Sequence, residues 1–397
     1  MRKVNILVDF VDEVERRGTF SVKWDKRAEV FPNSKVTPLW VADADWPTAP
    51  AIISALQRRV EHGVFGYTFA GDRHYQAIID WYNKRYDYEI KKEWLVFLNG
   101  VMPGINLLLR SLRSQAKSCL LQPPVYFPFS KAIRNSGLEK VENPLTFEEE
   151  LYYEIDWKDL KRKIEAKNPA YLLFCYPHNP VGRVWQDDEL LKLLRICAAK
   201  DILIISDEIH ADFTYQQKFK PLTMIAAENL NKRERPDVIS LNSPSKSFNI
   251  AGLHIAYAII PETRLRKKFQ RALSGIIPGP NPLALSALVA AYTEGEEWLD
   301  NQLEYLEANI SLVQDYLQQL PNLKFTKPEG TYLMWLDFSE IGLGNKKIAN
   351  KLYQEAEVGL QPGKWFGTGG ENFYRLNLAT KRERLEMSLQ RLIEVIN

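Results

Sequence analysis

A lysine that follows two serines is the residue with the clearest chemical potential in this chain of 397 residues. The stretch Ser243-Pro244-Ser245-Lys246 comes directly after the apolar run Val238–Leu241. A lysine amine can form a Schiff base with an aldehyde or ketone, and neighbouring hydroxyls can bind a phosphate. Lysines at strand ends are more often solvated surface residues, so Lys246 alone does not identify a site.

A carboxylate and an amide follow two other apolar runs. Asp207 comes after Ile202–Ser206, and Asn179 lies shortly after Tyr171–Tyr176. Taken singly, each would be read as a turn residue. A pyridinium cofactor needs a carboxylate at its ring nitrogen, a lysine at its aldehyde and a neutral donor at its phenolic oxygen. Asp207, Lys246 and Asn179 are residues of these three types.

The elements that must position these residues are short apolar runs separated by amphipathic stretches. The runs are Trp94–Leu98, Ser118–Leu121, Tyr171–Tyr176, Ile202–Ser206, Val238–Leu241 and Ile255–Ile260. This alternation predicts an α/β fold with a largely parallel sheet covered on both faces. Ligands of such sheets bind outside the carboxyl ends of the strands. The residues after five of the runs are therefore expected to line one polar pocket: Asn99-Gly100, Tyr126, Asn179, Asp207 and Lys246.

Three parts of the chain are predicted from the change of texture along it. Residues 49–287 are expected to form a large domain around the sheet, and residues 288–397 a smaller α+β domain. A long helix is predicted from Glu296 to about Leu320. Residues 1–48 are expected to join the small domain.

The composition excludes several classes of protein. Lys and Arg total 52 against 50 Asp and Glu, a net charge of +2, which argues against a nucleic-acid binder. No apolar run approaches the ~20 residues that span a bilayer. The three cysteines, Cys119, Cys175 and Cys197, share no close spacing, so free thiols in a reducing compartment are expected. We therefore predict a cytoplasmic protein without a membrane segment.

Nine stretches together carry a family resemblance that spans nearly the whole chain. They are GTFSVKWDK, PLWVADADWPTAP, HGVFGYT, QPPVYFPF, PHNPVGRVW, SDEIHADF, SPSKSFNIAGL, PEGTYLMWLDFS and YRLNLA. With them the chain resembles the fold-type I pyridoxal-phosphate enzymes of the class I/II aminotransferase family, and among these the cystathionine β-lyase group of PatB and MalY. The resemblance implies pyridoxal 5'-phosphate as cofactor, a mostly parallel seven-stranded sheet with a smaller α+β domain, and a homodimer with its sites at the subunit interface.

The resemblance also implies roles around the cofactor ring. Lys246 would bind the aldehyde and then move the substrate Cα proton, while Asp207 would keep the pyridine nitrogen protonated. Asn179 would donate to the phenolic oxygen, near which His210 stands where aminotransferases usually have a tyrosine. Tyr126 would stack on the ring. Asn179 and Tyr126 are also expected beside the substrate.

Phosphate and carboxylate binding are implied in the same way. The phosphate would be bound by two hydroxyls and three backbone amides: Ser243, Ser245, Gly100, Val101 and Met102. Tyr67 would reach the phosphate of the neighbouring subunit. Arg375 would bind the substrate α-carboxylate with its two-pronged guanidinium group.

Some positions depart from the family pattern. His254 stands where many aminotransferases have an arginine for the phosphate, a feature that the lyase group shares. Ala44 and Trp46 replace a methionine and a phenylalanine of the lyase group, and two further differences follow Arg375, at Leu378 and Thr380. We expect these four changes to lie where the substrate binds.

The function implied is α,β-elimination of L-cysteine S-conjugates to pyruvate, ammonia and a thiol. Transamination, and β-substitution or cyclisation in specialised metabolism, would use the same residues and remain open. A metal site is a different alternative, because Glu208, His210 and Asp212 would share one face of a strand. A non-catalytic module is disfavoured because Lys246 and Asp207 are both present.

Overall fold

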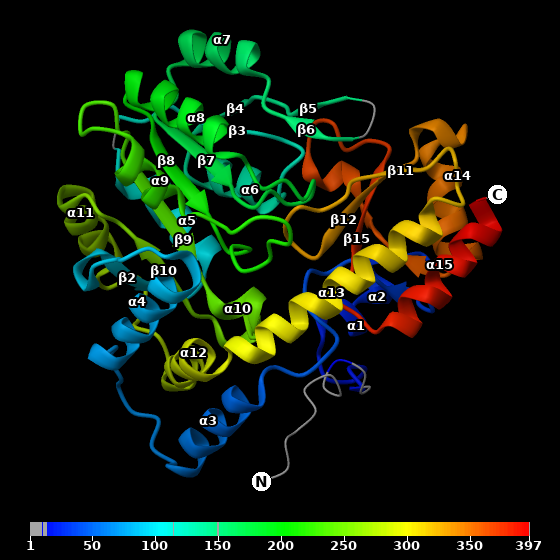
Figure 1. Cartoon of the computed structure of the whole chain (residues 1–397), viewed down its shortest axis with the longest axis horizontal. Coiled ribbons are helices and arrows are strands. Elements are labelled where there is room, and N and C mark those ends of the chain that lie inside the picture. The colour runs from blue at the N-terminus through cyan, green and yellow to red at the C-terminus, as the bar shows by residue number, and fades with distance from the viewer. Residues whose placement is uncertain (1–9, 11–13, 114, 149–150, 397) are drawn as a thin grey trace.

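A seven-stranded sheet forms the centre of the computed structural model, which describes residue 10 and residues 14–113, 115–148 and 151–396. Its strand order is β2-β10-β9-β8-β7-β3-β4 (Figure 1). The strands are β2 (Leu95–Leu98), β3 (Ser118–Leu121), β4 (Glu139–Glu142), β7 (Tyr171–Cys175), β8 (Leu203–Asp207), β9 (Val238–Asn242) and β10 (Ala256–Ile259). Only β10 runs antiparallel to its neighbours. The predicted mostly parallel seven-stranded sheet is therefore confirmed.

Each of the six predicted apolar runs forms a strand whose ends agree with the prediction within one residue. The seventh strand, β4, reads EKVE, and only Val141 of it is buried. It lies at the edge of the sheet, where one side of the strand has no partner. An edge strand does not need the continuous apolar run that marks the inner strands.

Helices cover both faces of this sheet because its strand residues alternate between two hydrophobic cores. In β8, Leu203 and Ile205 join one core and Ile204 the other. The first core also contains α5 (Val101–Ser111), α6 (Pro128–Asn135) and α11 (Thr263–Leu273). The second contains α4 (Asp72–Tyr86), α8 (Asp187–Ala199), α9 (Leu222–Asn229) and α12 (Pro282–Glu294).

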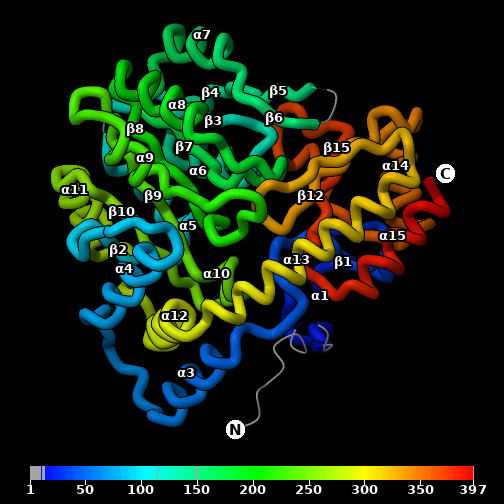
Figure 2. Tube along the Cα trace, in the orientation of Figure 1, coloured from blue at the N-terminus to red at the C-terminus, as the bar shows by residue number. Residues whose placement is uncertain are grey.

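A second, antiparallel sheet lies toward the C-terminus, in the order β11-β12-β15-β14. Its strands are β11 (Lys324–Phe325), β12 (Leu333–Asp337), β14 (Gln361–Pro362) and β15 (Phe373–Asn377). The helices of this region are α13 (Glu296–Leu317), α14 (Asn345–Asn350) and α15 (Arg382–Ile396). Figure 2 shows α13 running diagonally from the neighbourhood of α12 to that of α15. The predicted long helix from Glu296 is thus confirmed.

The first part of the chain lies beside this second region. Its elements are α1 (Val22–Asp25), α2 (Arg27–Val30) and β1 (Thr37–Pro38), and β1 pairs in parallel with β13 (Val358–Gly359). The predicted domain boundaries stay predictions. The one at residue 287 falls inside α12, and residues 1–9 and 11–13 of the predicted first segment lie outside the described residues.

The remaining elements are short or peripheral. They are α3 (Pro50–Glu61), β5 (Thr146–Phe147), β6 (Tyr153–Glu154), α7 (Trp157–Lys167) and α10 (Pro244–Ser247). Within the described ranges, no helix combines the length and the apolar character needed to cross a membrane.

Candidate active site

A cavity of about 540 Å³ lies at the carboxyl ends of strands β2, β7, β8 and β9. It brings together eleven of the twelve residues that the sequence singled out. They are Gly100, Val101, Met102, Tyr126, Asn179, Asp207, His210, Ser243, Ser245, Lys246 and Arg375. The parallel strands account for this convergence, because their carboxyl ends meet at one edge of the sheet.

Lys246 is carried by the short helix α10, directly after β9. The hydroxyl of Ser243 accepts a hydrogen bond from the Ser245 backbone N–H (3.0 Å) and donates to the carbonyl of Ile255 (2.5 Å). Ser243 therefore caps the turn that carries the lysine. The Lys246 Nζ donates to the backbone carbonyl of Ala42 at 2.6 Å.

Burial, with a smaller contribution from Arg375, lowers the pKa of the Lys246 amine to about 8, although Asp43 and Asp207 oppose the shift. A substantial fraction of the amine is therefore neutral near pH 8. A neutral amine is the form that attacks a carbonyl carbon, so the site favours the chemistry expected of this lysine.

Asp207 is the last residue of β8 and is buried. Its Oδ1 accepts a hydrogen bond from the Ile209 backbone N–H at 3.2 Å. Burial raises the pKa of its carboxyl to about 7, although this hydrogen bond and the charge of Lys246 oppose the rise. Few partners stabilise the charged form, so a cation bound beside Asp207 would gain strongly from it.

Arg375 reaches the cavity from β15, in the second sheet. Its Nη1 donates to Asn179 Oδ1 (2.9 Å) and its Nη2 to the carbonyl of Trp40 (2.8 Å). Its Nε has no hydrogen-bond partner among the described residues. Burial lowers the pKa of this guanidinium to about 10. A buried guanidinium with an unused donor is suited to binding a carboxylate.

The first turn of α5 forms one wall of the cavity. Gly100 precedes the helix with a φ of +132°, a conformation that favours glycine. The N–H groups of Val101 and Met102 lie in the first turn, where an α-helix offers no internal acceptor. These amides and the positive end of the helix dipole make the wall an anion-binding surface.

Two aromatic side chains complete the predicted set. His210 is buried, its Nδ1 has no partner among the described residues, and its ring lies 5.7 Å from that of Tyr332. Burial lowers the pKa of His210 well below its usual value, and the charges of Lys246 and Arg375 add to this effect. Tyr126 lines the cavity, and its ring packs on Phe129.

The structure does not support the alternative metal cluster. Strand β8 ends at Asp207, so the next residues form turns and do not alternate on a strand face. Glu208 accepts from the hydroxyl of Ser240 (2.6 Å), whereas Asp212 accepts from that of Tyr86 (2.6 Å). Among the described residues, no three His, Cys, Asp or Glu side chains are grouped to bind a metal ion.

Most of the other predicted positions lie away from the cavity. Tyr67 is fully exposed and does not line it. The expectation that four sequence departures lie where the substrate binds is wrong: Ala44, Trp46, Leu378 and Thr380 are buried outside the cavity lining. Trp46, for example, donates from its Nε1 to Gln302 Oε1 at 2.8 Å. His254 does line the cavity.

Several groups at the site were not predicted from the sequence. Trp40 and Ala42 contribute backbone carbonyls, and Phe127 and Trp365 contribute aromatic walls. A backbone carbonyl carries no residue-type signal. The stretch PLWVADADWPTAP, which contains Trp40 and Ala42, was the one available indication.

Comparisons with known proteins agree with this geometry. The sequence model of the aminotransferase class I and II family matches residues 38–392. Cystathionine beta-lyase PatB of Bacillus subtilis is 35% identical over 388 residues, which cover 97% of this chain and 99% of PatB.

Two solved structures share the whole architecture. A pyridoxal-phosphate-bound putative aminotransferase from Clostridium difficile 630 has a TM-score of 0.93 at 39% identity. The match covers 98% of this chain and 100% of the aminotransferase chain. The pyridoxal-phosphate-bound C–S lyase from Staphylococcus hominis has a TM-score of 0.89 at 31% identity, and the match covers 98% of this chain and 97% of the lyase chain. The chain thus belongs to the class I and II aminotransferase family.

Proposed function

We propose that the chain is a pyridoxal-phosphate-dependent carbon–sulfur lyase, which converts L-cysteine S-conjugates to pyruvate, ammonia and a thiol. One observation carries the proposal. A single cavity contains a partly buried amine, a buried carboxylate and a buried guanidinium, from Lys246, Asp207 and Arg375. This is the set that a pyridine aldehyde and an amino-acid substrate require.

The residues present fit pyridoxal phosphate. The pKa of Asp207, raised by burial, indicates a carboxylate that lacks a cationic partner, and a protonated pyridine nitrogen is such a partner. The first turn of α5, with Ser245, suits the phosphate. Asn179 uses its amide oxygen to accept from Arg375, so its amide nitrogen is the end that can donate to a phenolic oxygen.

The cofactor, when bound, supplies an electron-accepting ring that lowers the cost of removing a proton from the substrate Cα. Arg375 then binds the α-carboxylate and orients the Cα–H bond toward Lys246. The Lys246 amine takes the Cα proton, the Cβ–S bond breaks with its electrons on sulfur, and the departing thiolate takes up a proton from the lysine ammonium or water to become the thiol. The three-carbon remainder is hydrolysed to pyruvate and ammonia.

Two observations favour elimination over transamination. PatB, named a cystathionine beta-lyase, matches this chain over almost its whole length. His210 and His254 both line the cavity, at positions where many aminotransferases carry a tyrosine and an arginine. With His254 in place of an arginine, no guanidinium is available to the phosphate there, so the phosphate must rely more on α5 and Ser245.

A homodimer is part of the proposal, with Tyr67 reaching the site of the partner subunit. Tyr67 is fully exposed. The large apolar side chains near it in the sequence are each more than half exposed: Val60, Val64, Phe65 and Phe69. An apolar surface of this kind is typical of a protein interface. Sedimentation of the wild type and of a Tyr67→Ala variant, with cofactor retention as a second readout, tests it.

We also place the protein in the cytoplasm. Cys119, Cys175 and Cys197 are all buried and free. Burial raises the pKa of Cys197 to about 12, which keeps this thiol protonated and unreactive. Fractionation of the source cells, followed by detection of the chain, tests this assignment.

The decisive assay measures pyruvate and ammonia release from L-cystathionine, with pyridoxal phosphate and without any 2-oxo acid. Sustained, equimolar release is the expected result. Release only after a 2-oxo acid is added, with formation of the corresponding amino acid, would show transamination. Absence of both from a yellow, cofactor-loaded enzyme would point to β-substitution or cyclisation.

A further inference from the structure

One backbone segment touches both charged groups that the substrate must meet. We call residues 40–46, between β1 and α3, the strap. The carbonyl of Trp40 accepts from Arg375 Nη2 (2.8 Å), and that of Ala42 accepts from Lys246 Nζ (2.6 Å). The position of the strap therefore sets the spacing between the amine and the guanidinium.

Two asparagines hold the strap by its backbone. Asn249, three residues after Lys246, accepts from the Ala44 N–H (3.1 Å) and donates to the carbonyls of Ala44 (3.1 Å) and Trp46 (2.9 Å). Asn377, two residues after Arg375, donates to the carbonyls of Val41 (2.6 Å) and Asp43 (2.8 Å). The strap is thus tied to the segments that carry both active-site cations.

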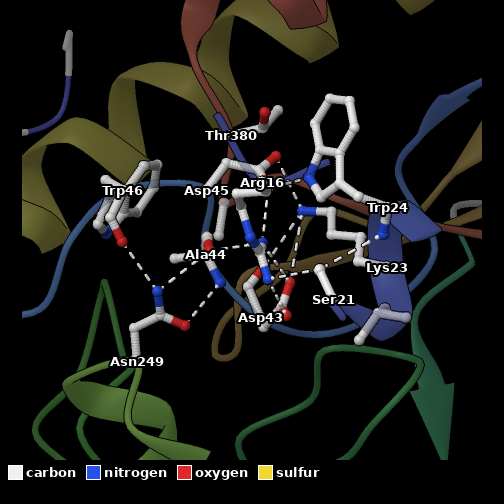
Figure 3. Close-up of polar contacts among 12 residues, drawn as sticks. Arg16, Ser21, Lys23, Trp24, Asp43, Ala44, Asp45, Trp46, Asn249 and Thr380 are labelled. Carbon is white, nitrogen blue, oxygen red and sulfur yellow. Dashed lines mark hydrogen bonds and ion pairs between the residues drawn. The ribbon is translucent and has the colours of Figure 1, made fainter. Parts of the chain in front are cut away.

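The two acidic side chains of the strap form an ion cluster with the N-terminal part of the chain (Figure 3). Arg16 binds Asp43 with two nitrogens (3.1 and 2.7 Å) and Asp45 with one (2.7 Å). Lys23 lies 3.0 Å from Asp45 and 3.7 Å from Asp43. Trp24 donates to Asp45 at 2.9 Å.

The Lys23–Asp45 pair at the centre of the cluster is buried, and the Arg16–Asp43 pair is partly exposed. The side chains of Lys23 and Asp45 are 0% and 1% exposed. Burial alone would raise the pKa of Asp45, but Lys23, Trp24 and Arg16 outweigh it and hold this pKa at about 2. Breaking a buried ion pair is costly, so the cluster resists displacement of the strap.

We propose that Asp43 and Asp45, bound by Arg16 and Lys23, are positioning residues that fix the strap and thereby the spacing between Lys246 Nζ and the Arg375 guanidinium. The inference rests on the proposed function, in which Arg375 binds the α-carboxylate while Lys246 moves the Cα proton. A displacement of ~1 Å in such an arrangement can cost ~10²-fold in rate.

Asp43 also supplies a spectroscopic signature. The charged groups that act on the Lys246 amine are Asp43 and Asp207, which raise its pKa, and Arg375, which lowers it. Of the two carboxylates, Asp43 has the larger effect. Removing its charge should therefore lower the pH at which the absorbance of bound pyridoxal phosphate changes. This shift reports the charge of Asp43 at the lysine, so it is read together with kcat and KM, which report the position of the strap.

The test compares two lysines of the N-terminal part of the chain. Lys23→Met removes the buried cation of the cluster. Lys26→Met is the matched control, because the Lys26 side chain is 55% exposed and its ion pair among the described residues is a local one, with Glu29. In the cofactor-loaded enzyme we expect Lys23→Met to lower kcat/KM at least ~10-fold, with kcat reduced and KM raised together, since Lys246 and Arg375 are both affected. Lys26→Met should stay within twofold of the wild type.

A double-mutant cycle adds the second readout. Asp43→Asn should lower kcat/KM and shift the absorbance transition to lower pH. The Lys23→Met/Asp43→Asn double variant should lose less than the product of the two single losses, because both residues act through one strap. Additive losses, or lowered melting temperatures with unchanged kcat, KM and absorbance transition, would overturn the proposal.

A milder variant keeps the test decisive if these proteins do not fold. Asp43→Glu keeps the charge and moves it by one methylene, so it should disturb the strap and raise KM. Wild-type kcat and KM in a folded Asp43→Glu variant would also overturn the proposal. If the wild type transaminates and does not eliminate, the proposed function fails, but the absorbance transition and the kinetics of that reaction still test the strap.

Discussion

Asp207 and Asp45 are buried to nearly the same extent, with 5% and 4% of their surfaces exposed, yet their pKa values are shifted in opposite directions. The pKa of Asp207, at the cavity, is raised to about 7 by burial. That of Asp45, behind the strap, is held at about 2 by Lys23, Trp24 and Arg16 against the same effect of burial. Partners, and not burial, therefore decide the charge state.

This difference in pKa distinguishes the cavity, where a ligand can bind, from the ion cluster behind the strap, which stabilises the fold. The charged groups of the cavity have neutral hydrogen-bond partners, which leaves Asp207, Lys246 and Arg375 able to gain from a ligand of opposite charge. The charges behind the strap already have charged partners. A ligand is expected to change the first group and to leave the second unaltered. Variants of the first group should therefore lower activity without a loss of stability, whereas variants of the second should lower stability and, through the strap, activity.

The largest effect is expected from Lys246→Ala. The variant lacks the amine that binds the aldehyde and moves the Cα proton, so activity should fall by at least ~10³-fold. The absorbance of covalently bound cofactor should disappear as well. Turnover and the absorption spectrum of the purified variant check both points, and retained activity would refute the role given to Lys246.

Asp207→Asn should be the next most damaging change to activity. Without the carboxylate the ring nitrogen loses its anionic partner, and removal of one such electrostatic group costs ~10²–10³-fold in kcat. The cofactor should still load, because Lys246 is intact. The measurement is kcat of a variant whose absorbance shows full loading with cofactor. A near-normal kcat would contradict the role given to Asp207.

Asp45→Asn should lower stability as well as kcat/KM, because Asp45 also helps to fix the strap. Breaking a buried ion pair costs ~3 kcal/mol, whereas an exposed pair such as Lys26–Glu29 contributes less than ~1 kcal/mol. Because the folded pKa of Asp45 is depressed, its contribution is complete above the unfolded pKa near 4 and is lost as the pH falls toward 2. Urea unfolding at pH 7 and pH 3 should show the gap to wild type narrowing in acid.

The smallest effect has the opposite sign. The raised pKa of Asp207 means that the apoenzyme loses stability as the pH rises from about 4 through about 7. Asp207→Asn should therefore stabilise the apoenzyme at pH 8, by ~1–2 kcal/mol. Unfolding of the apo and loaded forms tests this, since bound cofactor should cancel the gain. A destabilised apo variant would mean that Asp207 already has its partners.

The inner strands and the residues at their ends were predictable because both signals are local. Continuous apolar runs mark strands that are covered on both faces, and the edge strand β4, in which three of four residues are charged, escaped the pattern. Lys246, Asp207 and Asn179 could be singled out because their residue types are rare in combination at successive strand ends. Family resemblance, and not spacing, pointed to Arg375 and Tyr67.

The strap shows where such reasoning stops. Ala44 and Trp46 were expected near the substrate. Within the strap, however, the contact with Lys246 comes from the backbone carbonyl of Ala42, and the Asp45 carboxylate pairs with Arg16 and Lys23 outside the cavity lining. Lys23 and Arg16 lie about 20 to 30 positions before their partners. No local pattern reports such pairings.

Residue chemistry and apolar periodicity are properties of short stretches of chain, so the apolar strands and the reactive lysine can be read from the residues alone. The spacing between Lys246 and Arg375 is not local, because Lys246 lies on α10, after the central sheet's β9, while Arg375 lies on β15 of the second sheet, and the two meet across the strap. The pKa values of the buried charges depend on these long-range contacts as well. Folding brings the distant partners within hydrogen-bonding distance, and this proximity sets which charges are paired and which are left for a ligand.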